Sequence, residues 1–178
     1  MYVFWERGYE GTSVSDLTAA MGIGSPSLYA AFGDKEALFR EAVQRYRERF
    51  GHRPADEGSA REIIEGWLRE SAAEYVGEGR PRGCMVVLSA INCTEQNRGA
   101  RDFLAALRRN NLEMLKVRLR EKLGEEADVD ALVQFYGTIL HGMSIQARDG
   151  ADLADLQAVV DMAMTAWPRF LKKKTTPG

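Results

Sequence analysis

The sequence has little of what a disulfide-bonded, metal-binding or membrane-spanning protein needs. Its 178 residues include only two cysteines, Cys84 and Cys93, and two histidines, too few for a disulfide framework or a metal-ligand cluster. No apolar run approaches the ~18 residues of a membrane span, and the apolar start of the chain lacks the basic lead of a signal peptide. We therefore expect a cytoplasmic protein with no metal, no cofactor and no membrane partner.

An excess of charge of one sign is also missing, because 24 Lys and Arg stand against 26 Asp and Glu. The net charge of −2 does not by itself indicate nucleic acid as a partner. A nucleophile–base pair and paired carboxylates in an apolar setting are absent from the sequence as well, so we do not expect an enzyme. What the sequence does have is 45% apolar residues, enough for the core of one large or two small domains.

Helical periodicity fills the chain, whereas strand signals are nearly absent. Apolar residues recur three and four positions apart in most segments, which predicts an all-α fold. The polar stretch GHRPADEG at 51–58 is the best domain boundary. We therefore expect a first domain at 1–50, whose first helix is cut short, and a second domain at 51–178.

Cap residues give approximate helix boundaries. Helices are expected after Ser13, Ser25, Asp34, Ser59, Asp128 and Asp152, each of which suits an N-cap position. The helix after Ser25 is brief, about 26–31, with Pro26 in its first turn. An almost wholly apolar helix is expected at 84–93, a long amphipathic helix over 103–123, and a last helix from 153 to about 171.

The first fifty residues predict a helix-turn-helix, in which two helices are joined by a short turn containing Gly22 and a third helix braces them. A helix as short as 26–31 is marginal alone, so its Leu28 and Phe32 must pack inward. Their expected partners are Leu17, Met21 and Leu38.

Small polar groups and alanine on the opposite side of this short helix allow a close approach to the floor of a DNA major groove. The hydroxyl of Tyr29 and the ammonium of Lys35 suit phosphate oxygens. The backbone N–H groups at the helix start capped by Ser13 are another anion contact. The alternative is a buried helical hairpin with no DNA role.

Three motifs occur in order at 8–14 (GYEGTSV), 21–23 (MGI) and 27–38 (SLYAAFGDKEAL). With them the chain resembles, over nearly all of residues 2–50, the N-terminal domain of the TetR family of bacterial transcriptional regulators. The resemblance implies a ligand-responsive repressor that binds double-stranded DNA at a palindromic operator as an Ω-shaped homodimer. The C-terminal helices would form the pocket for a small-molecule effector and the dimer interface.

The resemblance also assigns roles to single residues. Thr12, Ser13, Tyr29 and Lys35 would contact phosphates, and Gly24, Ser25, Pro26, Ser27 and Ala30 would face bases. Relatives usually carry a dozen or more residues, often basic, ahead of the position of Met1. Residues 1–51 hold six Lys or Arg against seven Asp or Glu. Ala30 and Ala31 have no polar side-chain group with which to read a base directly. DNA shape and a leader before Met1 are therefore expected to contribute.

The second domain supplies two further sets of candidates. A four-helix dimer interface is expected from wide apolar faces near the C-terminus, the alternative being an ordinary bundle core; its residues are Gly137, His141, Gly142, Ile145, Leu156, Val160, Ala163, Met164 and Trp167. A mostly apolar effector pocket is expected from a mixture of aromatic, methionine and polar residues, each of which is otherwise plain core; these are Trp67, Tyr75, Met85, Leu88, Asn92, Phe103, Met114, Phe135 and Tyr136.

Cys84 carries the alternative function, that of a thiol-based redox or electrophile sensor on the same scaffold. It follows Arg80 and Arg82 at a predicted helix start, where a thiolate is favoured, and some TetR-family members resemble this junction and sense oxidants through a cysteine. The plainer interpretation is a small buried hydrophobe. An intrachain disulfide with Cys93 is not expected, because the two lie on different faces of the predicted helix.

Overall fold

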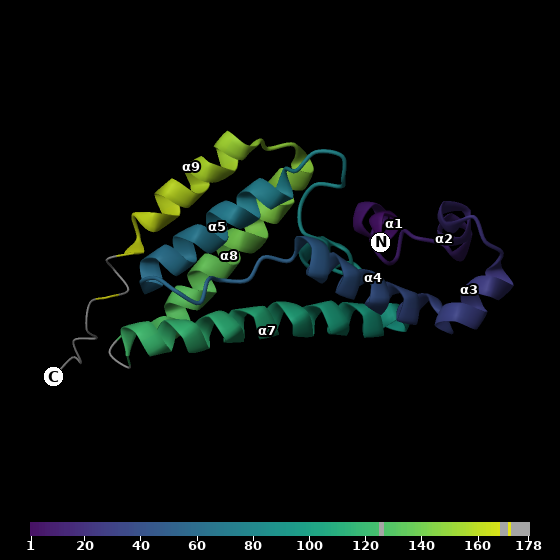
Figure 1. Ribbon diagram of the computed structural model, residues 1–178, viewed down its shortest axis with the longest axis horizontal. Helices are drawn as coiled ribbons and strands as arrows, with labels where there is room; N and C mark the ends of the chain where they lie inside the picture. The colour runs from purple at the N-terminus through teal and green to yellow at the C-terminus, as the bar shows by residue number, and fades with distance from the viewer. Residues whose placement is uncertain (125–126, 168–170, 172–178) are drawn as a thin grey trace. The chain divides into compact units, whose positions relative to one another are not determined.

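The computed structural model describes residues 1–124, 127–167 and 171, and throughout this part of the chain the regular structure is helical (Figure 1). The all-α prediction is therefore confirmed. The elements are α1 (Tyr2–Arg7), α2 (Val14–Met21), α3 (Ser25–Phe32), α4 (Lys35–Phe50), α5 (Ala60–Tyr75), α6 (Met85–Leu88), a 3-10 turn η1 (Glu95–Asn97), α7 (Arg98–Leu123), α8 (Val129–Asp149) and α9 (Leu153–Met164). Within the described residues, none of these helices combines the length and the apolar character needed to cross a membrane.

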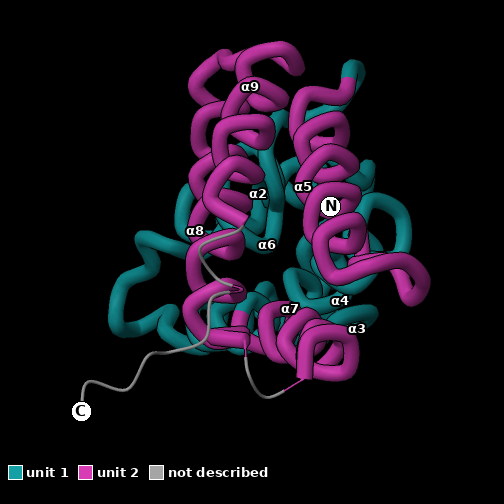
Figure 2. Tube along the Cα trace, turned by 90° about the vertical axis from the view of Figure 1, so that its left-hand side faces the viewer, with its two compact units in different colours: residues 1–51, 78–108 teal, residues 52–77, 109–178 magenta. Residues whose placement is uncertain are grey.

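The chain forms two compact units (Figure 2). Unit 1 comprises Met1–Gly51 and Glu78–Arg108, and unit 2 comprises His52–Gly77 and Arg109–Gly178. The first division falls at the predicted linker, but the chain returns to unit 1 before α7 carries it into unit 2. The assignment of DNA binding to 1–50 and of effector binding to 51–178 stays a prediction.

Aromatic residues of α1 and α4 form the centre of unit 1. The ring of Phe4 lies edge-on to that of Phe39 with centroids 5.0 Å apart, and Trp5 lies edge-on to Tyr46 at 4.8 Å. The indole N–H of Trp5 donates to the carbonyl of Gly83 at 3.0 Å. Helix α1 has only six residues, too short to be stable alone, so this packing and the buried hydrogen bond hold it. The segment that follows Gly83 completes the core with Met85, Val86, Ala90 and Leu104.

The predicted caps in unit 1 are largely confirmed. The backbone N–H of Asp16 donates to Ser13 Oγ while Asp16 accepts from the Ser13 backbone, a complete capping box for α2. Asp34 caps α4 by accepting from the N–H of Ala37 at 2.7 Å. The prediction for Ser25 is wrong: α3 begins at Ser25 itself, and Gly24, in an extended conformation, occupies the N-cap position without a side-chain hydrogen bond.

Two other helix boundaries differ from the sequence prediction. Within 84–93 only Met85–Leu88 is helical. The carbonyl of Val86 accepts from the Arg108 side chain at 2.7 Å, and that of Ser89 accepts from the Tyr9 N–H at 2.6 Å. Helix α9 ends at Met164, where Thr165 closes the last turn through bonds to the carbonyls of the preceding residues. Leu171 is not helical, and the predicted continuation through 168–170 lies outside the described residues.

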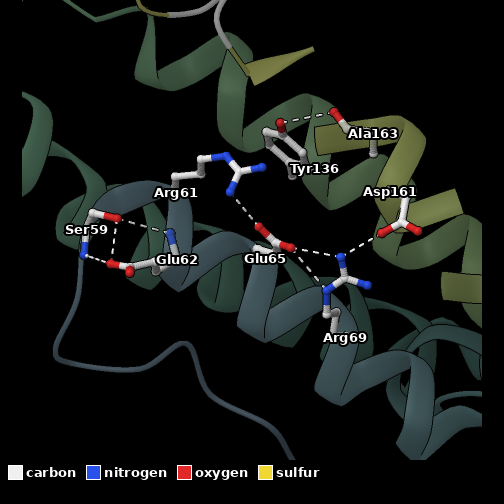
Figure 3. Close-up of polar contacts among 8 residues, drawn as sticks. All are labelled: Ser59, Arg61, Glu62, Glu65, Arg69, Tyr136, Asp161 and Ala163. Carbon is white, nitrogen blue, oxygen red and sulfur yellow. Dashed lines mark hydrogen bonds and ion pairs between the residues drawn. The ribbon is translucent and has the colours of Figure 1, made fainter. Parts of the chain in front are cut away.

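Helices α5, α8 and α9 pack on one another in unit 2 (Figure 1). The hydroxyl of Tyr136 on α8 donates to the carbonyl of Ala163 on α9 at 3.2 Å. On the polar side, Arg69 of α5 joins Glu65 and Asp161 at 2.8 and 2.6 Å, which ties α5 to α9 (Figure 3). These hydrogen bonds raise the pKa of Arg69 above its usual value, because they favour the charged guanidinium.

The predicted linker at 51–58 is held in place by contacts within unit 2. Pro54 is buried and its carbonyl accepts from Arg118 of α7, which also pairs with Asp56 at 2.5 Å. The imidazole of His52 lies 3.4 Å from a carboxylate oxygen of Glu74. The capping box of Ser59 and Glu62 then starts α5 as predicted (Figure 3).

Candidate nucleic-acid interface

Helix α3 presents nearly all of its surface to solvent. It fully buries Leu28 alone, and Phe32 is half-buried against the unit 1 core. The predicted base-facing positions are all exposed, and Tyr29 extends outward with 48% of its surface accessible. The exposed set is Gly24, Ser25, Pro26, Ser27, Ala30 and Ala31. A helix with so little bulk on its outer face can approach a groove floor closely.

One inward residue therefore carries most of the packing of α3. Leu28 has 0% exposure and lies in the same buried cluster as Leu17 and Leu38, as the sequence predicted. Met21 does not share this role, because 39% of its surface is exposed at the end of α2. The left-handed conformation of Gly22, with φ 66°, turns the chain there, a backbone geometry that favours glycine.

The two residues before α2 differ in what they offer a phosphate. Ser13 is exposed, but its backbone N–H and hydroxyl donate to the Asp16 carboxylate in the capping box. The remaining N–H groups of the first turn of α2 have no intrahelical partner and can face an anion. Thr12 is only 1% exposed, and its hydroxyl donates to the carbonyl of Gly8 at 2.6 Å. The predicted phosphate contact of Thr12 does not fit this placement, because its side chain is used inside the loop. We therefore leave Thr12 out of the proposed DNA surface.

Lys35 is held in place by the loop before α2. Its Nζ lies 4.3 Å from the centroid of the Tyr9 ring, a cation–π contact. Burial lowers the pKa of Lys35, while the charges of Glu10 and Cys93 raise it. Burial, with Glu36 and other acidic neighbours, raises the pKa of Tyr9 to about 12. The phenol therefore stays neutral, and its ring face helps to fix the position of the Lys35 ammonium group.

The supporting roles of Tyr9 and Glu10 were not predicted from the sequence. Glu10 accepts from the side-chain amide of Asn97 at 2.6 Å and from the N–H of Thr94 at 3.3 Å. These bonds lower the pKa of Glu10, so its charge persists beside Lys35. In the GYE stretch at 8–10, only Tyr9, an aromatic residue within the motif, could have been noticed as a supporting residue. The role of Glu10 could not be predicted, because its hydrogen-bond partners lie more than eighty residues away.

Paired charges surround the interface. Arg7 pairs with Asp16 at 2.6 Å, and Arg40 pairs with Glu36 at the same distance. A Cβ on Gly99, near the start of α7, would lie 2.6 Å from Glu36 Oε2, so the Glu36 carboxylate lies close to this turn of the helix. Because Arg7 and Arg40 are already matched by carboxylates, we expect them to contribute less to nonspecific attraction to DNA.

The predicted dimer residues divide into a buried and an accessible group. Leu156, Val160, Ala163, Met164 and Trp167 are each at most 7% exposed, because they form the α9 side of the unit 2 core. Their side chains are thus covered by their own chain, and their part in a dimer interface stays a prediction. Sequence spacing alone gave the width of the apolar face but not which part of it α5 covers.

Two glycines of α8 also divide into one that is packed within the chain and one that is accessible. A Cβ on Gly137 would lie 2.7 Å from Leu112 Cδ2 of α7, so this position allows close packing within the chain. A Cβ on Gly142 would meet nothing within 4 Å. Around Gly142 lie Ile145, 46% exposed, and the partly buried His141. On α9, Met162 is 71% exposed, so accessible apolar surface does exist on these two helices.

The predicted pocket residues fall in both units. Trp67, Tyr75, Met114, Phe135 and Tyr136 belong to unit 2, whereas Met85, Leu88, Asn92 and Phe103 belong to unit 1. Burial raises the pKa of Tyr136 to about 12, so its hydroxyl stays a donor to Ala163. The effector pocket as a whole stays a prediction.

Cys84 is the N-cap of the four-residue α6 and is half-buried. Cys93 is half-buried as well, and burial together with Glu10 raises the pKa of its thiol, which disfavours the reactive thiolate. The two cysteines do not form a disulfide with each other. The sensor alternative on Cys84 is not favoured.

The fold and the exposed α3 define a class, the helix-turn-helix transcriptional regulators. The family model for bacterial regulatory proteins, tetR family, matches residues 1–42. The chain is 30% identical over 185 residues to the HTH-type transcriptional repressor ComR of Escherichia coli (strain K12), covering 97% of this chain and 87% of that protein. It is 29% identical to the HTH-type transcriptional repressor BdcR of the same strain, covering 96% and 86%.

A solved structure shows the same similarity in three dimensions. A cysteine mutant of the TetR family transcriptional regulator CifR, in complex with 26-bp double-strand operator DNA, is 43% identical and superposes with a TM-score of 0.89. The match covers 94% of this chain and 92% of that one. The chain therefore belongs to the TetR family of bacterial transcriptional regulators, as its N-terminal motifs indicated.

Proposed function

We propose that this protein is a transcriptional repressor that binds a palindromic DNA operator as a homodimer and is released by a small-molecule effector. The observation that carries the proposal is α3, a helix held by one fully buried leucine, whose predicted base-facing positions are all exposed and carry small side chains. Repressors among its relatives and the operator complex of CifR support it. A DNA-binding role would place the protein in the bacterial cytoplasm, and we propose no enzymatic activity.

The proposed contacts follow from exposure and chemistry. Ser25, Ser27 and Ala30 face bases, where small side chains allow close approach. Tyr29 donates its hydroxyl to a phosphate oxygen, Lys35 supplies a cation, and the start of α2 supplies backbone N–H groups. Two such helices, one per subunit, would lie one DNA turn apart.

The dimer is proposed to use the accessible part of α8 and α9. Ile145 and Met162 are large apolar groups exposed on the single chain, and the open space at Gly142 allows a partner helix to approach. An effector that binds one arrangement of the dimer better than the other would change the spacing of the two α3 helices and hence operator affinity. The wall residues of unit 2 proposed for this effector include Trp67 and Phe135.

The experiment is a selection of operator DNA from random sequence with the purified protein, followed by titrations of the selected site at several salt concentrations. Lys35→Ala is expected to lower affinity and to reduce the slope of log K against log salt by about 1 for each subunit that loses a phosphate contact. Lys122→Ala, at the exposed end of α7, is the matched control. Equal slopes for wild type and Lys35→Ala would show that Lys35 does not contact phosphate.

A further inference from the structure

The segment 94–103, which we call the brace, comprises Thr94, η1 and the start of α7. It belongs to unit 1, and it lies outside the residues 1–42 that the family model matches. Its contacts nonetheless reach the two places that hold the candidate phosphate contact Lys35. One is the loop between α1 and α2, and the other is the first turn of α4.

The first contact joins the brace to the loop between α1 and α2. The side-chain amide of Asn97 donates to Glu10 Oε2 at 2.6 Å, and the N–H of Thr94 donates to Glu10 Oε1 at 3.3 Å. Tyr9, next to Glu10 in the chain, carries the ring whose centroid lies 4.3 Å from Lys35 Nζ. The brace therefore helps to fix the loop on which the Lys35 ammonium rests.

The second contact joins the brace to α4, the helix that begins with Lys35. The guanidinium of Arg40 lies over the ring of Phe103, 4.5 Å from its centroid, which is a cation–π contact. The same guanidinium pairs with Glu36 at 2.6 Å. Glu36 follows Lys35 directly, and its carboxylate lies against the first turn of α7 beside Gly99.

These supports matter because a free lysine side chain loses rotamer freedom when it is fixed on a phosphate. A side chain that already rests on the Tyr9 ring has lost part of this freedom before it binds. Burial lowers the pKa of Lys35, and the charge of Glu10 opposes this effect. Because both oxygens of Glu10 accept from the brace, a direct ion pair with Lys35 is disfavoured, and the ammonium stays available to a phosphate.

We propose that Asn97 and Phe103 are positioning residues for DNA binding. Asn97 acts on Lys35 through Glu10. Phe103 acts through Arg40 on the first turn of α4. The effect on operator affinity rests on the proposed function, whereas the effect on the Lys35 side chain is present without DNA.

The position of Lys35 is measured without DNA, in side-chain spectra of the ¹³C-labelled full-length protein. The Lys35 Hε protons are expected upfield of those of other lysines, because they lie near the face of an aromatic ring, and Lys35→Arg assigns them. Asn97→Ala is expected to reduce this upfield shift. Asn92→Ala, at an exposed position of the same unit, is the matched control and is expected to leave it unchanged. An unchanged Lys35 signal in Asn97→Ala would overturn the role of Asn97.

The effect on DNA binding is measured on the selected operator, with variants that circular dichroism shows to be folded. Asn97→Ala is expected to lower affinity several-fold and to reduce the salt slope, whereas Asn97→Gln, which keeps an amide donor, retains more affinity than Asn97→Ala. In a Lys35→Ala background, Asn97→Ala is expected to have no further effect, because the two residues act as one unit. A loss of equal size in both backgrounds would show a merely structural role and refute the positioning of Lys35.

Phe103 is tested with two substitutions at its half-buried position. Phe103→Leu removes the ring but keeps an apolar side chain, and it is expected to weaken operator binding several-fold. Phe103→Tyr keeps the ring and is expected to bind as the wild type does. In an Arg40→Ala background the effect of Phe103→Leu is expected to vanish. Equal affinities of the two variants, or an undiminished effect without Arg40, would overturn the role of Phe103.

The two levels of the proposal fail in different ways. If no operator can be selected, the proposed function is contradicted, and the DNA-binding role of the brace with it. The Lys35 spectra would then still decide whether Asn97 fixes Lys35. If an operator is selected and Lys35→Ala weakens its binding but the brace variants do not, only the positioning roles are overturned.

Discussion

Leu28→Ala is the substitution for which the structure gives the sharpest expectation. Leu28 is 0% exposed and is the fully buried residue of α3, a helix of eight residues. A helix of this length is not stable alone in water. Its presentation to DNA therefore depends on the packing of this one side chain against Leu17 and Leu38.

The expected loss of stability follows from complete burial. Truncating a buried leucine to alanine costs about 2–5 kcal/mol, of which part is the lost transfer free energy and part the remaining cavity. Because α3 lies at the edge of the unit 1 core and Phe32 is only half-buried, its other contacts cannot compensate. We expect α3 to detach locally before the rest of the unit unfolds.

The assay compares operator affinity with stability in matched variants. Leu68→Ala is the control, because Leu68 is also 0% exposed but lies in α5 of unit 2. Both variants are expected to lower the free energy of urea-induced unfolding by a similar amount. At a temperature where both remain folded by circular dichroism, Leu28→Ala is expected to lose operator binding by at least tenfold, and Leu68→Ala to retain it within a few-fold.

Hydrogen exchange of the α3 amides gives an independent measurement. In Leu28→Ala these amides are expected to lose protection while those of α4 keep it. If folded Leu28→Ala binds the operator as well as Leu68→Ala does, α3 does not need this anchor and is not the element that reads DNA. Such a result would refute the reasoning from the single buried leucine.

Three further outcomes are expected. Gly137→Ala should destabilise the protein by about 1–3 kcal/mol because its Cβ would crowd Leu112, whereas Gly66→Ala, with nothing within 4 Å, should be stabilising by up to about 1 kcal/mol in urea unfolding. Met162→Lys should shift the mass seen in sedimentation toward the monomer, and an unchanged dimer would exclude this face. The Ser59 backbone and hydroxyl lower the pKa of Glu62, so its stabilisation is present above the usual glutamate pKa and lost as pH falls through the lowered value; Glu62→Gln should flatten that acid limb of a stability–pH curve.

Local signals predicted the helix starts well. Ser13, Asp34, Ser59, Asp128 and Asp152 all cap the helices assigned to them, because a side-chain cap is an interaction between residues two or three apart. Ser25 is not the cap, because Gly24 takes the extended conformation of the N-cap position instead. Glycine has no side chain by which the sequence could indicate that role. Sequence information of this kind therefore places an element to within a residue or two but does not choose between adjacent caps.

Nonlocal contacts explain what the sequence did not predict. The 84–93 segment reads as one apolar helix, yet only part of it is helical, and its carbonyl at Ser89 bonds to the N–H of Tyr9, eighty residues earlier. The apolar residues of α9 read as a surface for a partner, yet Leu156 and Val160 are covered by the chain's own helices. Periodicity gives the width of an apolar face, and only the packing of other elements decides what covers it.

The same distinction applies within the candidate site. Exposure at α3 follows from its own sequence, because a short helix with one inward leucine leaves the remaining positions outside. The position of Lys35 depends instead on Tyr9 below it and on Glu10, which is fixed by Asn97. A cation whose supports come from a distant segment responds to anything that moves that segment.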